Sequence, residues 1–186
     1  MSGQQPGLSF SHVGIYVGAI EAAADFYANV LDFTVTDRGS LATPDGGSVS
    51  LVFLSRDPDE HHQIVLVSGR PDSATFSTIN QISLRADSLA TLRRYHQRLR
   101  SAEAQAIACV SHGNAVSLYA QDPEGNRIEL FWDTPWYVPQ PMRVPVDIDT
   151  PDEELLAAIE VQVRAQPGFK PRAVWRAETA QLMGLS

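Results

Sequence analysis

An internal duplication limits what this 186-residue chain can fold into. An alternating apolar run followed by an amphipathic stretch occurs at residues 11–31 and again at residues 80–99. The alternation is typical of a strand, and the later spacing is typical of a helix. At an offset of 69 residues, apolar or aromatic side chains coincide in both copies, as in the pairs Val13 and Ile82, Ile15 and Leu84, Ile20 and Leu89, Phe26 and Tyr95, and Val30 and Leu99. Each half therefore begins with a strand and a helix of the same pattern.

Three short strand-like runs follow each helix and are separated by Gly, Pro and Asp. They span residues 33–37, 49–55 and 63–67 in the first half and residues 107–110, 116–120 and 127–132 in the second. The sequence thus predicts an α+β fold made of two βαβββ modules. The modules cover residues 9–70 and 78–133, after an N-terminal tail at residues 1–8. Each module can curl a small mixed sheet, and the two concave faces together would form a cup.

Residues 134–186 do not follow the repeat. Prolines at positions 135, 139, 141 and 145 indicate an extended crossing. A helix is expected from Thr150 to about Gln166, where a Pro-Gly pair ends it. Because this C-terminal helical extension carries four aromatic residues, we expect it to cover part of the cup or the partner subunit of a homodimer. The aromatic residues are Trp136, Tyr137, Phe169 and Trp175.

The composition limits the partners that the chain is expected to have. With 14 basic and 22 acidic side chains the net charge is −8, which favours a small neutral or cationic ligand over nucleic acid or an anionic membrane. The single cysteine, Cys109, excludes an intramolecular disulfide and lies in an apolar run typical of a buried thiol. No run of about 18 apolar residues occurs, so we expect a soluble, cytoplasmic protein.

Strand alternation indicates which side chains enter the cup. His12 would point into it from the first strand, opposite the face that packs on the helix. If both His61 and His62 lie in a strand, they must point in opposite directions, so only one can belong to a site. Glu129 shares a face with Arg127. A carboxylate in an otherwise apolar strand needs a partner, because burying it alone is costly.

Two imidazoles and one carboxylate could meet in the cup as a metal-binding facial triad, an arrangement that suits Fe(II). His12 and His62 are 50 residues apart, and His62 and Glu129 are 67 apart, close to the repeat offset. This spacing predicts that Glu129 is the second-half counterpart of His62. The other interpretation is that His12 and His62 are hydrogen-bonded core or surface residues.

Three segments resemble the vicinal oxygen chelate superfamily, which includes glyoxalase I, extradiol ring-cleaving dioxygenases, fosfomycin-resistance enzymes and bleomycin-binding proteins. The resemblance covers about residues 9–133, and its most specific part is the last segment. The segments are Ser11-His12-Val13-Gly14-Ile15, His61-His62-Gln63-Ile64-Val65-Leu66 and Asp122-Pro123-Glu124-Gly125-Asn126-Arg127-Ile128-Glu129-Leu130.

Within the superfamily the chain is most similar to the extradiol dioxygenases, because His62 followed by an apolar strand matches their second metal histidine. That resemblance implies one divalent metal held by His12, His62 and Glu129. Fe(II) is the metal expected, although Mn(II), Ni(II) and Zn(II) accept the same ligands. It also implies that His112 and Tyr119 line the substrate side, the first as an acid or base and the second as a hydrogen-bond partner of the bound diolate.

One residue departs from the dioxygenase pattern. Where those enzymes commonly have a second-half histidine near the metal, the repeat offset places Gln81. Glutamine can donate a hydrogen bond or ligate through its carbonyl, but it cannot exchange a proton near neutral pH.

The sequence leaves three functions open. The first is an extradiol-type dioxygenase that acts on a catechol-like aromatic substrate with dioxygen. The second is a glyoxalase- or epimerase-like lyase or isomerase that works through an enediolate. The third is a binding module that holds a small molecule or drug without turnover.

Overall fold

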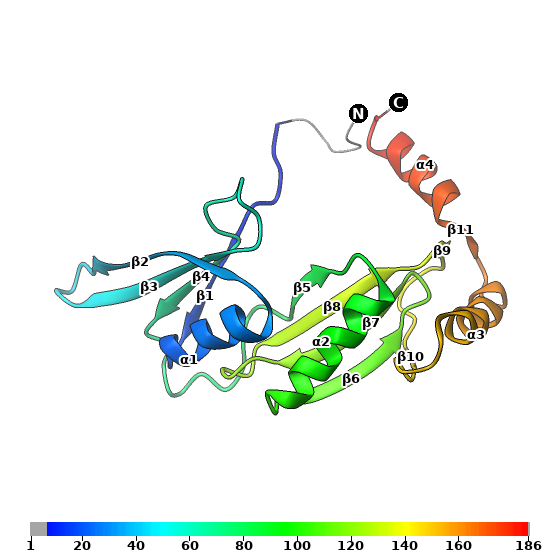
Figure 1. Cartoon of the computed structure of the whole chain (residues 1–186). Helices are drawn as coiled ribbons and strands as arrows, with labels where there is room; N and C mark the ends of the chain where they lie inside the picture. The colour runs from blue at the N-terminus through cyan, green and yellow to red at the C-terminus, as the bar shows by residue number, and fades with distance from the viewer. Residues whose placement is uncertain (1–6, 186) are drawn as a thin grey trace.

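The computed structural model describes residues 7–185, in which two sheets lie side by side and helices cover one face of them (Figure 1). The first sheet has the strand order β1-β4-β3-β2, with β1 and β4 parallel and the other pairs antiparallel. Its elements are β1 (Val13–Val17), α1 (Ile20–Asp25), the π-helical turn η1 (Phe26–Val30), β2 (Thr34–Ala42), β3 (Ser48–Ser55) and β4 (Ile64–Ser68).

The second sheet repeats this plan in the order β6-β7-β8-β5, again with only β5 and β8 parallel. A short strand from the C-terminal extension, β10 (Val144–Pro145), pairs with β6 and lengthens the sheet by one strand. The elements of this half are β5 (Ile82–Arg85), α2 (Leu89–Ser101), β6 (Gln105–Ser111), β7 (Ala115–Gln121) and β8 (Arg127–Asp133). The predicted α+β fold of two βαβββ modules is confirmed.

Strand pairing shows which residues are equivalent in the two modules. Val13 pairs with Ile64 in the first module, and Ile82 pairs with Ile128 in the second. Gln81 is therefore the counterpart of His12, as the repeat offset predicts. The prediction that Glu129 is the counterpart of His62 is wrong, because the loops before β4 and β8 differ in length. Position 129 corresponds instead to Val65.

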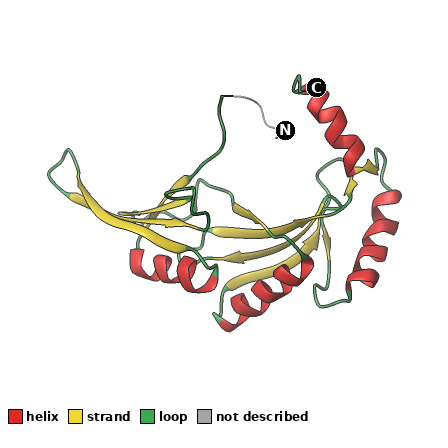
Figure 2. Cartoon of the chain, turned by 45° about the horizontal axis from the view of Figure 1, so that its top comes forward, coloured by secondary structure: helices red, strands yellow, loops and turns green. Residues whose placement is uncertain are grey.

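Helices α1 and α2 cover the same face of the two sheets, and the opposite face stays open (Figure 2). The strands send alternate apolar side chains to the helical side, where Leu66, Leu118 and Ile128 are almost completely buried. The side chains between them point to the open face. That face therefore carries Glu129 and its neighbours.

A loop of the second module joins it to the first. The buried carboxylate of Asp122 accepts hydrogen bonds from the Tyr27 hydroxyl of η1 (3.2 Å), from the backbone N–H of Glu124 (2.9 Å), and from the backbone (2.8 Å) and side-chain (2.9 Å) nitrogens of Asn126. The Glu124 carboxylate accepts from the backbone N–H groups of Gly18 and Ala19, just before α1. The most specific motif of the sequence therefore closes a turn and connects the modules.

The C-terminal extension packs on the second module. It contains β9 (Trp136–Tyr137), β10, α3 (Asp152–Arg164), β11 (Lys170–Pro171) and α4 (Arg172–Leu182). The helix expected to end near Gln166 corresponds to α3, whereas α4 follows it and was not expected. Ile159 and Val163 of α3 join the buried core, and Tyr137 stacks on Trp175 with ring centroids 5.3 Å apart.

Gly113 shows how closely the extension approaches the sheet. Its φ is +73°, and a Cβ atom there would lie only 2.6 Å from Val138 Cγ2 and 2.9 Å from the sulfur of Met142. Only glycine combines this backbone conformation with such an approach at no steric cost. The extension is thus seated directly beside His112. In residues 7–185, no helix is both long and apolar enough to cross a bilayer.

Candidate active site

The open face of the second module centres on Glu129, which is only 7% exposed. In the strand register it lies between Ser83 of β5 and Tyr119 of β7. One carboxylate oxygen accepts hydrogen bonds from Gln81 Nε2 (2.7 Å) and Ser83 Oγ (2.5 Å), and the other accepts from the Tyr119 hydroxyl (2.7 Å). The partner that a buried carboxylate requires is thus supplied by three neutral donors.

His112 extends this network toward the C-terminal extension. Its Nδ1 lies 2.7 Å from the carbonyl oxygen of Met142. Because a carbonyl can only accept, Nδ1 carries a hydrogen and the neutral ring has its lone pair on Nε2. Nε2 lies 3.0 Å from the Tyr119 hydroxyl and 4.0 Å from the Glu129 carboxylate. The imidazole, the phenol and the carboxylate therefore form one hydrogen-bonded network.

This His112–Tyr119–Glu129 network has one hydrogen too few for its two contacts when the imidazole is neutral. The Tyr119 hydroxyl has a single hydrogen, but both Glu129 and Nε2 of His112 are placed to accept it. A proton on Nε2 would let His112 donate to Tyr119 while Tyr119 donates to Glu129, so that both contacts become hydrogen bonds. Burial, followed by the bond to Glu129, raises the pKa of Tyr119 to about 12. The phenol therefore stays protonated at neutral pH, and its single hydrogen cannot serve Glu129 and His112 at the same time.

The histidines of the first module lie outside the strands. β4 begins at Ile64, so alternation does not apply to His61 and His62. Their Nδ1 atoms lie 2.9 Å apart, and both rings contact Phe53. They were expected to point in opposite directions only if both lay in a strand, and that condition is not met. His12 precedes β1, and its ring centroid lies 4.3 Å from that of His62. Burial and the neighbouring imidazoles His12 and His61 lower the pKa of His62, which favours the neutral form that a metal ligand needs.

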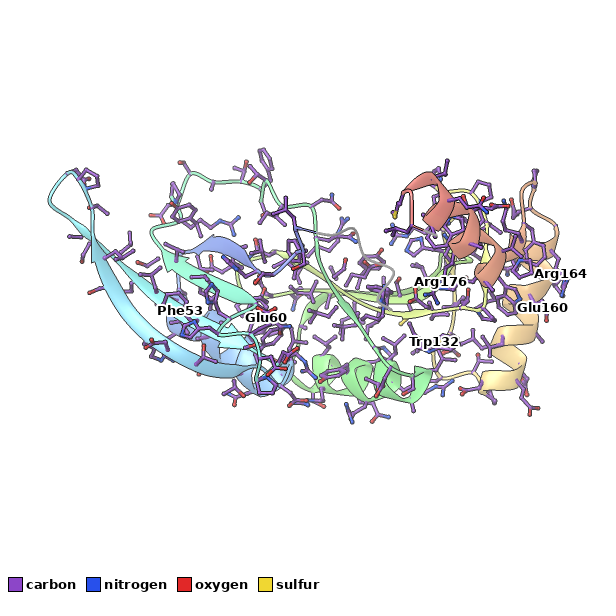
Figure 3. All side chains as sticks on the ribbon, turned by 90° about the horizontal axis from the view of Figure 1, so that it is seen from above. Phe53, Glu60, Trp132, Glu160, Arg164 and Arg176 are labelled. Atoms are coloured by element: carbon purple, nitrogen blue, oxygen red, sulfur yellow. The ribbon has the colours of Figure 1, made fainter. Side chains whose placement is uncertain are left out.

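The predicted metal ligands do not come together within one chain. Across residues 7–185, no group of three His, Cys, Asp or Glu side chains is placed to hold one metal ion. His12 and His62 are adjacent in the first module, whereas Glu129 lies in the second module and accepts hydrogen bonds from Gln81, Ser83 and Tyr119. In Figure 3, Phe53 and Glu60 mark the histidine side of the molecule, whereas Trp132 of β8 lies toward the C-terminal helices. A single chain therefore does not fit a three-ligand metal, and the ligand assignment stays a prediction.

Two cavities border Glu129 through its hydrogen-bond partners. The larger, about 590 Å³, lies between the modules and is lined by Ser11 and Gln63 from one and by Gln81 and Ser83 from the other. The smaller, about 240 Å³, is lined by His112, Tyr119, Arg127 and Arg143, among others. The smaller cavity is the one that borders both His112 and Tyr119.

Two features of this site were not expected from the sequence. Met142, which orients His112, and Arg143, whose guanidinium lies 5.5 Å from the Tyr119 ring centroid, come from the proline-rich crossing. Nothing in the repeat pattern marks these residues. Arg85 of β5 does not contact Glu129, because its Nε pairs with Asp133 at 3.1 Å.

The chain is similar in sequence to two curated dioxygenases. It is 30% identical over 125 residues to biphenyl-2,3-diol 1,2-dioxygenase 2 of Rhodococcus globerulus, a match covering 65% of this chain and 60% of that protein. It is 28% identical over 131 residues to catechol-2,3-dioxygenase of Bacillus subtilis (strain 168), covering 67% of this chain and 42% of that one. The chain thus spans only about half of the length of the curated relatives it matches.

Solved structures share the fold at lower identity. A glyoxylase/bleomycin resistance protein/dioxygenase domain from Frankia sp. EAN1pec matches with a TM-score of 0.55 and 21% identity, covering 70% of this chain and all of that one. The fosfomycin resistance protein of Listeria monocytogenes matches with a TM-score of 0.52 and 19% identity, over 70% and 94% of the two chains. The family model of the Glyoxalase/Bleomycin resistance protein/Dioxygenase superfamily matches residues 9–130, and the chain belongs to this superfamily.

Proposed function

We propose that the protein is an extradiol-type dioxygenase that acts on a catechol-like aromatic diol. The observation that carries this proposal is the hydrogen-bonded network of His112, Tyr119 and Glu129, which has one hydrogen too few for its contacts. His112 and Tyr119 of this network line the 240 Å³ cavity. A diol must lose a proton to react as a diolate, and Nε2 of His112 in this network has the lone pair to accept it. The names of the two dioxygenase relatives support the same substrate class.

Each side chain of this network has a separate role in the proposed proton transfer. His112 Nε2 accepts the proton of a diol hydroxyl, while the Met142 carbonyl holds the ring by its Nδ1–H. Tyr119 then accepts a hydrogen bond from the imidazolium and donates its own to Glu129, whose negative charge stabilises the cation. Gln81 and Ser83 keep the carboxylate in place without exchanging protons. These roles belong to the side chains alone, since in residues 7–185 of one chain no three His, Cys, Asp or Glu side chains are placed to hold a metal.

The test is an oxygen-electrode assay with catechol and with biphenyl-2,3-diol, on protein whose metal content has been measured. We expect oxygen uptake that matches the formation of a yellow ring-cleavage product. It should stop after chelation and return with one added divalent metal, Fe(II) above Mn(II), Ni(II) or Zn(II). Conversion of a substrate without oxygen uptake would indicate a lyase or isomerase. Saturable binding of the diols with no conversion would indicate a binding module, and either result contradicts the proposal.

We further propose that two copies of the chain complete the metal site. His12 and His62 of one subunit would join Glu129 of the partner subunit, which accounts for the separation of these groups within one chain. In a twofold dimer each of two equivalent sites would then take donors from both subunits.

Co-expression of two variants tests this arrangement. His12→Ala and Glu129→Ala dimers should each lose the metal, because each lacks a ligand in both sites. A random mixture of the two should regain about one quarter of the wild-type metal content, since half of the dimers are mixed and each of these has one intact site. Metal content is measured by mass spectrometry, with His96→Ala as the unaffected control. A mixture that stays as empty as its parents would contradict the shared site.

A further inference from the structure

Arg127 and Arg143 are two arginines without an ionic partner in the cavity that contains His112 and Tyr119. In the part of the chain that the structure describes, no carboxylate lies within ion-pair distance of either. By contrast, the guanidinium groups of Arg85 and Arg172 both bind Asp133. The protein as a whole has a net charge of −8, but two unpaired arginines make this cavity locally positive. An anion is the ligand that they would attract.

The two arginines reach this cavity from different parts of the fold. Arg127 is the first residue of β8 and lies on the same face as Glu129. Arg143 precedes β10, where Val144 pairs with Ser111 at the end of β6. This pairing places the Arg143 guanidinium over the Tyr119 ring, 5.5 Å from its centroid. The segment that orients the imidazole of His112 through Met142 therefore also places a positive charge beside the phenol.

We propose that Arg127 and Arg143 bind a carboxylate on the substrate, so that the substrate is an aromatic diol acid rather than an uncharged catechol. A planar guanidinium matches a carboxylate with two parallel hydrogen bonds, which gives orientation as well as affinity. With the acid held by the arginines, the rest of the ring stays in the same cavity as His112 and Tyr119. This substrate class rests on the proposed function, but binding of the acid can be measured without turnover.

The experiment is isothermal titration calorimetry of the full chain with 2,3- and 3,4-dihydroxybenzoate and with catechol, which lacks only the carboxylate. We expect at least one of the acids to bind ten times more tightly than catechol or better. Arg127→Gln and Arg143→Gln should each remove about a tenfold share of that preference, because they weaken binding of the acid far more than binding of catechol. Arg100→Gln, which removes an exposed arginine of α2, is the matched control. Both target arginines are exposed, so these variants should unfold at the wild-type temperature.

The outcomes separate this inference from the proposed function. If catechol is cleaved with oxygen uptake but neither acid binds more tightly, the carboxylate site is refuted and the dioxygenase proposal stands. If an acid binds in an arginine-dependent way but no diol is converted, the anion site stands and the dioxygenase proposal fails. Inorganic phosphate that binds more tightly than either dihydroxybenzoate would overturn the choice of a carboxylate.

Discussion

His112→Ala should lower kcat by about 10²–10⁴-fold, the usual contribution of a general acid or base. The variant keeps Tyr119 and Glu129 but removes the one imidazole that contacts them among the described residues. The phenol cannot replace it, because its pKa of about 12 keeps it protonated at neutral pH. Steady-state kinetics with the best diol substrate of the wild-type protein will measure the loss. Affinity for a diol should change much less than kcat.

Two further variants test whether the loss of kcat comes from the missing imidazole of His112. His96→Ala removes an imidazole from α2, on the covered side of the sheet, and should retain the wild-type kcat. Tyr119→Phe removes the link between His112 and Glu129 and should lower kcat as well, because the imidazolium then loses its path to the carboxylate. A His112→Ala enzyme with kcat within about threefold of wild type would refute the proton-accepting role.

Asp122→Ala should lower the free energy of unfolding by about 3–5 kcal/mol, a large share of the stability of a small domain. The substitution leaves the Tyr27 hydroxyl and the Asn126 amide buried without their acceptor. Each such donor costs about 1–3 kcal/mol. The turn that joins the modules also loses the oxygen that accepts its backbone N–H groups. Urea denaturation followed by circular dichroism measures the change.

Two controls accompany this measurement. Tyr27→Phe removes one hydrogen bond but leaves the carboxylate with its other donors, so it should cost only about 1 kcal/mol. Asp72→Ala removes an exposed carboxylate and should change stability by less than about 0.5 kcal/mol. If Asp122→Ala were no less stable than Tyr27→Phe, the loop would not hold the modules together as described.

The sequence alone was enough to predict the architecture. The 69-residue offset and the two periodicities led to two βαβββ modules, because burial of one strand face and one helix stripe imposes periods that are visible in the residues. Alternation also placed Glu129 on the open face, and the resemblance added His112 and Tyr119, whose mutual contacts the structure shows.

Only the tertiary structure decided where the histidines and the C-terminal extension lie and what they contact. His61 and His62 lie just before β4, where the alternation rule ends, so their directions depend on Phe53 and on each other. The β5–β8 register, and not the spacing in the chain, makes Val65 the counterpart of Glu129. Met142 and Arg143 reach His112 and Tyr119 through the pairing of β10 with β6. Such contacts between distant segments leave no periodic signal, because they follow from the packing of the folded chain.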